Sequence, residues 1–141
     1  FQEAVKIPFI ISSPNYAKNQ TTESFTELVD VYPTLCELAN ISPPAYLHGK
    51  SLTPVLENPS IRLKDEIYTR YKEGEAVIDS DYSYTEFYRG KEYLGNMLYD
   101  MKTDLKQNID ISKRAANAEL VEKYRKKLRV MREFVNKNPL E

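Results

Sequence analysis

Residues 27–59 read ELVDVYPTLCELANISPPAYLHGKSLTPVLENP. The spacing predicts a short helix that starts after Asp30, because a carboxylate at that position accepts hydrogen bonds from the free amides of the first turn. Pro33 falls inside this turn, where its missing N–H costs nothing. Asn40 suits the left-handed conformation that ends a helix. A proline-stiffened loop follows, and Ser51 is placed to start a second short helix.

Both predicted helices carry apolar residues at helical spacing, which indicates that each buries one face. The first stripe is Val31, Leu35 and Leu38, and the second is Leu52, Val55 and Leu56.

The segment before this stretch predicts a buried strand. Val5 to Ser12 is nearly continuously apolar, with β-branched and aromatic residues, which is typical of a strand covered on both faces. Pro8 favours a sheet edge or a bulge. Since the rest of the chain offers no alternating strands and helices to cover such a strand, we expect it to belong to a larger domain of which this chain is a fragment.

The following segment predicts an antiparallel meander, because short β-prone runs are separated by turn residues. The expected strands are 65–71, 76–79, 82–88 and 97–101. In the third strand Tyr82, Tyr84, Glu86 and Tyr88 share one face. The chain has 11 Tyr and no Trp, which fits a thin sheet whose rings are half buried and whose hydroxyls reach water.

A long helix is predicted from Lys113 to about Asn136, with Ser112 as its N-cap. At 1.5 Å per residue it spans roughly 35 Å, enough to cross the whole meander. Its apolar stripe is Leu120, Tyr124, Leu128, Met131 and Val135.

Composition places the chain among ordinary globular proteins. It has 141 residues, 41% hydrophobic and 29% charged, and it contains no apolar run long enough for a membrane span. Residues 1–112 hold 11 Lys/Arg against 17 Asp/Glu, whereas residues 113–141 hold 9 against 4. The basic residues are spread around the last helix and interleaved with Glu, so a solvated helix is favoured over nucleic-acid binding. Cys36 is the only cysteine, which excludes an intrachain disulfide.

Four motifs occur in a specific order: FQEAVKIPFII at residues 1–11, VDVYPTL at 29–35, GKSLTPVL at 49–56 and LYDMKTDLKQN at 98–108. Together they resemble the C-terminal third of type I, formylglycine-dependent sulfatases, and in particular the iduronate-2-sulfatase-like branch. The resemblance runs from residue 1 to about residue 108, and the long terminal helix is compatible with it.

The expected fold class is therefore α+β: a short antiparallel sheet packed by a long C-terminal helix. The resemblance implies that the N-terminal strand and the two short helices belong to a larger α/β domain of the alkaline-phosphatase-like kind. On this interpretation residues 1–59 end the sulfatase core, and residues 60–141 form a C-terminal subdomain.

The resemblance implies a sulfatase that uses a formylglycine nucleophile and a calcium ion on the sulfate oxygens. It also implies a periplasmic or secreted location. The formylglycine motif, Cys or Ser followed by x-Pro-x-Arg, is absent here, since Cys36 is followed by Glu-Leu-Ala-Asn. In the family the nucleophile and metal ligands lie upstream of the first strand. We therefore expect no catalytic residue and no metal ligand in this chain, which alone should be inactive and should depend on the N-terminal catalytic part of the same protein.

Three residues are candidates for contact with a sulfated sugar. Arg70 and Lys72 lie beside a flexible turn, where two cations could hold a sugar carboxylate or a second sulfate; a solvated hairpin tip is the alternative. His48 could face a substrate cleft or lie in an exposed loop. Glu75, Asp79 and Asp81 lack the pattern of a calcium loop, so solvated charges are favoured over a metal cluster.

Two other functions remain open from the sequence. The first is a non-catalytic carbohydrate- or protein-binding module that uses the tyrosine-rich sheet face, with no catalysis. The second is a fragment of a related phosphatase or phosphonate hydrolase.

Overall fold

The computed structural model describes residues 5–137. They divide into two compact units, which are described separately. The helical unit comprises residues 9–65, and the sheet unit comprises residues 66–137 together with residues 5–8. The assignment of residues 1–59 to the end of a larger core stays a prediction.

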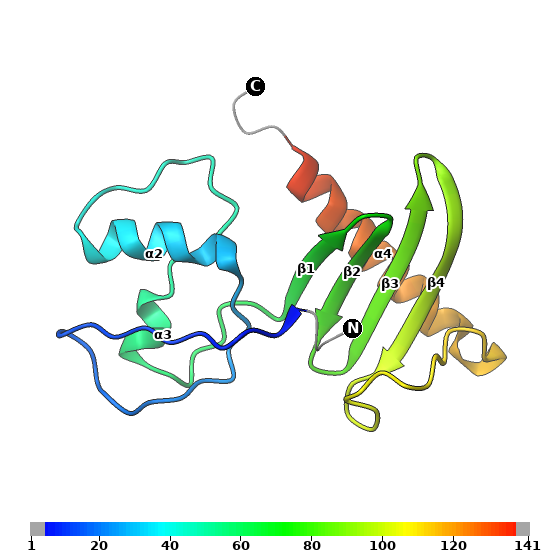
Figure 1. Cartoon of the computed structure of the whole chain (residues 1–141), viewed down its shortest axis with the longest axis horizontal. Helices are drawn as coiled ribbons and strands as arrows, with labels where there is room; N and C mark the ends of the chain where they lie inside the picture. Colours follow the sequence, from blue (N-terminus) through cyan, green and yellow to red (C-terminus); the bar gives the residue numbers. More distant parts are fainter. Residues whose placement is uncertain (1–4, 138–141) are drawn as a thin grey trace. The chain divides into compact units, whose positions relative to one another are not determined.

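The helical unit contains the two predicted helices (Figure 1). A 3-10 turn, η1 (Leu28–Asp30), leads directly into α2 (Val31–Leu38), and α3 (Thr53–Glu57) follows the proline-rich loop. Asn40 has a φ of 55°, which confirms its predicted left-handed conformation after α2.

The buried side of α2 differs from the predicted stripe. Leu35 is 57% exposed, while Pro33, Thr34 and Cys36 are buried. The reason is the hydroxyl of Thr34, which accepts a hydrogen bond from the backbone N–H of Leu52 at 2.9 Å. This bond holds the Thr34 side of the helix against the chain that follows it, so Leu35 faces outward, while Val31 and Leu38 of the predicted stripe are partly buried.

The predicted strand over Val5 to Ser12 is not formed in this structure. Residues 6–12 lie in no helix or strand, and Ile10 is 89% exposed. A buried strand needs neighbouring strands to satisfy its backbone groups, and none of the described strands pairs with this segment. Its pairing within a longer protein stays a prediction.

The predicted meander is confirmed in the sheet unit. Within the described residues, β1 (Glu66–Tyr71), β2 (Gly74–Asp79), β3 (Tyr82–Arg89) and β4 (Glu92–Asp100) form one antiparallel sheet in the order β1-β2-β3-β4 (Figure 1). The fourth strand starts earlier than predicted. Gly90 adopts a φ of 62°, so a tight turn forms and Arg89 pairs directly with Glu92.

The long helix α4 (Ala118–Asn136) packs across one face of this sheet (Figure 1). It starts later than predicted, because a 3-10 turn, η2 (Ala115–Asn117), precedes it. Ser112 is not its cap: the Ser112 hydroxyl donates to Asp110 Oδ2 at 3.0 Å instead. The core combines three strand residues and three helix residues: Val77, Tyr84, Leu98, Val121, Tyr124 and Leu128.

The tyrosines of this core are more buried than the sequence predicts. Tyr84 and Tyr124 are almost completely buried, and their hydroxyls bind carboxylates rather than water. The Tyr84 hydroxyl donates to Glu86 Oε1 at 2.9 Å, and the Tyr124 hydroxyl donates to Asp79 Oδ2 at 2.6 Å. Since α4 covers this face, the tyrosine-rich side of β3 is unavailable as the binding surface of a module.

Within residues 5–137, no helix is long and apolar enough to cross a membrane.

Asp79 joins the sheet to α4, and its hydrogen bonds predict how the stability of the fold depends on pH. Burial alone raises the pKa of Asp79, but hydrogen bonds from Tyr124, Lys127 and the backbone amides of Asp81 and Tyr82 outweigh it and hold the pKa below its usual value. A carboxylate with a lowered pKa stabilises the fold above the pKa of the unfolded chain, about 3.9, and loses this effect as the pH falls through the folded pKa.

We therefore expect Asp79→Asn to lower the free energy of unfolding by about 1–3 kcal/mol at neutral pH, and this deficit to shrink below about pH 4. Urea unfolding across the pH range measures both effects. Asp81→Asn is the matched control, since its ion pair with Lys102 is exposed and its loss should matter much less. A deficit for Asp79→Asn that grows as the pH falls would contradict the assignment.

Candidate functional site

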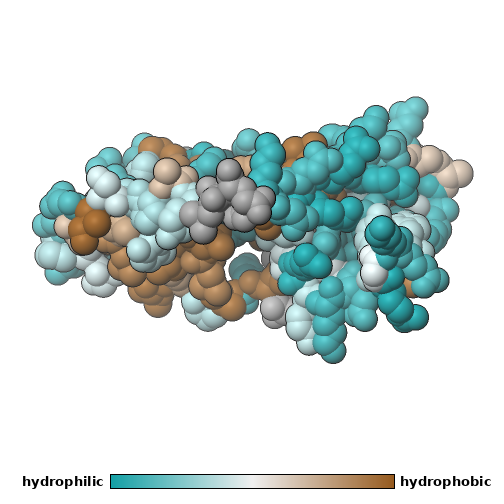
Figure 2. All heavy atoms as spheres, turned by 90° about the horizontal axis from the view of Figure 1, so that it is seen from above, coloured by the Kyte–Doolittle hydropathy of each residue, from teal (hydrophilic) through white to brown (hydrophobic). Residues whose placement is uncertain are grey.

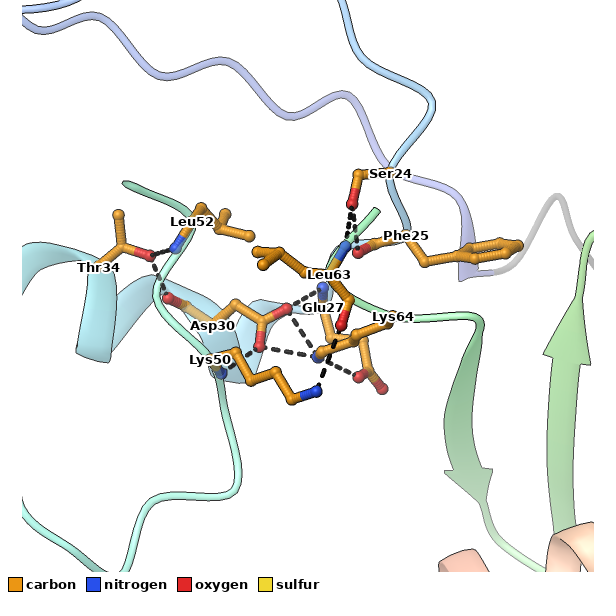
Figure 3. Close-up of polar contacts among 9 residues, drawn as sticks. All are labelled: Ser24, Phe25, Glu27, Asp30, Thr34, Lys50, Leu52, Leu63 and Lys64. Carbon is orange, nitrogen blue, oxygen red and sulfur yellow. Dashed lines mark hydrogen bonds and ion pairs between the residues drawn. The ribbon is translucent and has the colours of Figure 1, made fainter. Parts of the chain in front are cut away.

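A fully buried carboxylate organises the helical unit. Asp30 has no exposed surface, and its oxygens receive hydrogen bonds from three separate segments (Figure 3). The backbone N–H of Glu27 donates to Oδ2 and that of Lys50 to Oδ1, each at 2.8 Å. The Lys64 ammonium lies 2.8 Å from both oxygens. Asp30 occupies the predicted N-cap position of α2, but its carboxylate makes no capping hydrogen bond to the first turn. It connects η1 with two distant parts of the chain instead.

The segment from Gly49 to Leu52 is held against the same turn at two further points. The Thr34 hydroxyl donates to the Asp30 carbonyl at 2.5 Å while it accepts from Leu52 (Figure 3). A Cβ atom at Gly49 would lie 2.0 Å from the Val29 carbonyl oxygen, so only glycine allows this approach. The backbone beside His48, the first predicted contact residue, is thus fixed in place.

The other two predicted contact residues lie together in the sheet unit. Arg70 and Lys72 line a hollow of about 560 Å³ at one end of the sheet, which we call the tip basin. Its cations are Arg70, Lys72, Arg89, Lys91 and Arg132, and its carboxylates are Glu73 and Glu75. His48 belongs to the helical unit and is not among the residues of this basin.

Sequence reasoning missed three of these cations. Arg89 and Lys91 could have been found, because the first and third turns of an antiparallel meander lie at the same end of the sheet. Arg132 gives no such signal: only the packing of α4 brings it to this end.

The carboxylate of Glu75 neutralises part of the tip basin. It forms an ion pair with Arg132 and lies 3.5 Å from Arg70 Nε. Arg132 also contacts Glu86 at 3.2 Å and lies over the ring of Tyr88, 4.9 Å from its centroid. Burial alone lowers the pKa of Arg132, but the hydrogen bond and charge of Glu75 raise it above its usual value. Arg132 is therefore a fixed, fully charged wall of the basin.

Glu86 is the centre of a buried hydrogen-bond network between the sheet and α4. Its buried carboxylate accepts from the hydroxyls of Tyr84 and Tyr88, at 2.9 and 3.0 Å, and from Arg125 at 3.2 Å. These partners, with Arg132, engage both of its oxygens.

The part of the chain that the structure describes contains no group of three or more His, Cys, Asp or Glu side chains suited to a metal ion. Asp79 instead pairs with Lys127 at 2.9 Å, and Asp81 pairs with Lys102 at 2.8 Å. Cys36 is buried and unpaired with another cysteine.

Comparison with known proteins identifies the family. Residues 1–134 match the family "N-sulphoglucosamine sulphohydrolase, C-terminal". The chain belongs to this sulfatase family. A Delta 4,5-hexuronate-2-O-sulfatase from Bacteroides thetaiotaomicron is 29% identical over 137 residues, which cover 89% of this chain and 28% of that protein. The chain thus spans about a quarter of the length of this relative.

Two solved structures share the fold of this sulfatase C-terminal chain. A protein solved with its substrate D-glucosamine-2-N,6-O-disulfate aligns with a TM-score of 0.68 at 24% identity, covering 78% of this chain and 24% of its own. A phosphonate monoester hydrolase from Silicibacter pomeroyi aligns with a TM-score of 0.78 at 17% identity, covering 92% and 29%. The predicted α+β arrangement, a four-stranded antiparallel sheet with a long terminal helix and short helices, is confirmed.

The close approach at Gly49 generates a prediction for this sulfatase region. We expect Gly49→Ala to destabilise the helical unit by about 3 kcal/mol or more, because the new methyl group collides with backbone that Asp30 holds in place. Gly90→Ala is the matched control: it lies in open space with a φ of 62° and should cost about 1 kcal/mol of conformational strain. Denaturant unfolding compares the two variants, and equal losses would contradict the packing described for Gly49.

Proposed function

We propose that this chain is the C-terminal part of a sulfatase that hydrolyses sulfate esters of sulfated sugars, similar to iduronate-2-sulfatases. The observation that carries the proposal is the family match over residues 1–134. The hexuronate-2-O-sulfatase among its relatives and the family's name, N-sulphoglucosamine sulphohydrolase, support a sulfated hexuronate or glucosamine as substrate. The nucleophile, as formylglycine, and the calcium ligands come from the N-terminal catalytic part of the same protein, which acts in the periplasm or outside the cell.

The first role of the chain is to complete the fold of the enzyme. The helical unit has an apolar face around α2, to which Leu28, Val29, Tyr32 and Leu35 contribute, and Leu28 is 68% exposed. Figure 2 shows hydrophobic residues, in brown, on the visible surface of the helical unit. Exposed apolar patches mark interaction surfaces, so this face is the one that packs on the catalytic part.

The second role is to form a wall of the substrate cleft. Arg70 is the best-placed contact because it is more than half exposed and shares Glu75 with Arg132 over a long 3.5 Å contact. A guanidinium held this loosely can exchange its partner for a sugar carboxylate or sulfate. Lys72 lies beside it in the basin, and His48 follows the fixed loop of the helical unit as a third contact.

The acidic residues of the β2–β3 region do not oppose an anionic substrate. The sequence raises this objection because Asp79 and Asp81 place two negative charges in this region. Asp81 pairs with Lys102, and Asp79 pairs with Lys127, which it shares with Glu66, so each carboxylate already has a cation partner.

A phosphonate hydrolase is the second candidate function. The alignment with the phosphonate monoester hydrolase at a TM-score of 0.78 favours it on fold, but an identity of 17% carries the fold alone.

The test is an assay of the full-length protein with calcium, on a uronate 2-sulfate, an N-sulfated and 6-sulfated glucosamine, and a phosphonate monoester. We expect turnover of a sulfated sugar with a kcat/KM well above that for the phosphonate. The 141-residue chain alone should give no turnover of an aryl sulfate, because its sequence lacks the Cys/Ser-x-Pro-x-Arg motif from which formylglycine is made. Preferred hydrolysis of the phosphonate, or turnover by this chain alone, would sink the proposal.

Arg70 provides a sharper prediction within the full-length protein. We expect Arg70→Ala to raise KM for a sulfated uronate about tenfold with little change in kcat, because a binding contact distant from the reacting bond is lost. Arg129→Ala removes another exposed arginine, on α4 and outside the basin, and should leave both constants unchanged. Unchanged kinetics for Arg70→Ala would remove this residue from the cleft.

A further inference from the structure

The tip basin joins two turns that are distant in the sequence. Because the sheet is an antiparallel meander, the β1–β2 turn at Lys72 and Glu73 and the β3–β4 turn at Gly90 and Lys91 lie at the same end (Figure 1). Residues from both turns line one hollow of about 560 Å³, a size within the range of about 300–1,000 Å³ that is usual for small-ligand sites.

The cations of this hollow are not balanced by its carboxylates. Glu75 is shared by Arg70 and Arg132. Lys72, Arg89 and Lys91 form no ion pair within the described residues 5–137. Three cations without an ion-pair partner thus surround a concave surface, and the exposed Glu73 is the negative charge beside them. Such an excess attracts anions.

The same end presents aromatic rings next to the charges. Tyr71 is 76% exposed, with the Lys72 ammonium 5.4 Å from its ring centroid. Tyr88 lies deeper, under the guanidinium of Arg132. Flat aromatic faces beside cations suit a ligand that carries both a ring with apolar C–H faces and anionic substituents.

The distribution of the cations over two turns determines the kind of anion. One exposed cation gains little from one anion in water, at most about 1 kcal/mol. A ligand with several linked anionic groups can contact both turns at once and gains from each. A long nucleic acid fits less well: residues 66–137 carry 15 Lys/Arg and 13 Asp/Glu, so the unit lacks the overall basic excess of such binders.

We propose that the tip basin binds a sulfated oligosaccharide, with Arg89 and Lys91 contacting an anionic group on a sugar next to the one that Arg70 and Lys72 contact. This inference rests on the proposed function, and it narrows the substrate class from sulfated monosaccharides to chains that carry anionic groups on successive sugars.

The test is titration calorimetry of the full-length protein with a sulfated glucosamine–uronate hexasaccharide, at low and high ionic strength. We expect binding that weakens as salt rises, and a Kd about tenfold higher for the Arg89→Ala/Lys91→Ala double variant. The Lys106→Ala/Lys113→Ala double variant is the matched control, since it removes two exposed cations outside the basin. Equal effects of the two double variants would overturn the proposal.

A second variant tests the same site in the opposite direction. Glu73→Gln removes the exposed carboxylate of the basin, while the Glu73 backbone carbonyl still accepts from Tyr88 N–H. We expect the hexasaccharide to bind about two to three times more tightly to this variant, and unchanged or weaker binding contradicts the site.

Two further ligands define the class. The chemically desulfated hexasaccharide should bind at least tenfold more weakly, and equal binding would exclude recognition of sulfate. Single-stranded DNA of similar charge should also bind more weakly, and equal or tighter binding would assign the basin to polyanions in general. Binding is measured without turnover, so the two proposals can fail separately. If the protein hydrolyses sulfated monosaccharides but does not bind the hexasaccharide, only this inference is wrong. If the protein binds the hexasaccharide but hydrolyses no sulfated sugar, the proposed function is wrong.

Discussion

The helical unit depends on a negative charge that has no contact with water. Moving a carboxylate out of water costs several kcal/mol unless hydrogen bonds and an opposite charge replace the lost solvation. Asp30 obtains these from the amides of Glu27 and Lys50 and from the ammonium of Lys64. The segments around residues 50 and 64 must therefore return to η1, and the loop that carries His48 takes its position from this requirement.

The sheet unit follows the same principle with a different set of groups. Besides the apolar core, ion pairs with carboxylates of the sheet hold α4 in place. Lys127 pairs with Asp79, and Arg125 and Arg132 pair with Glu86. Replacing such pairs by apolar groups is often neutral for stability, whereas breaking one of them is costly. These ion pairs favour one rotation of α4 about its axis and one position along that axis. This placement brings Arg132 to the end of the sheet.

Features that depend on neighbouring residues can be predicted from the sequence, whereas features that depend on residues distant in the sequence cannot. Asn40 and the turn at Gly90 act through neighbouring residues, so the ends of α2 and β3 could be read from local patterns. The exposure of Leu35 could not, since it results from a bond between Thr34 and Leu52, 18 positions away. Asp30 shows the same difference. Its residue type and position suit a helix cap, but its carboxylate binds Lys50 and Lys64, which are distant in the sequence. Arg70 and Lys72 were found because they share one turn, and Arg132 was missed because α4 packing alone places it.

The two ends of the sheet differ in how their charges are used, and this difference connects the fold with function. At the β2–β3 turn, Asp79 and Asp81 each have a lysine partner, Lys127 and Lys102. At the opposite end, Glu75 is shared by Arg70 and Arg132, which leaves the cations on the two turns without carboxylate partners among the described residues. A fold gains nothing from unpaired like charges held close together, because they repel each other. Their persistence at one end, on turns whose backbone the sheet fixes, is what a surface shaped for an anionic ligand requires.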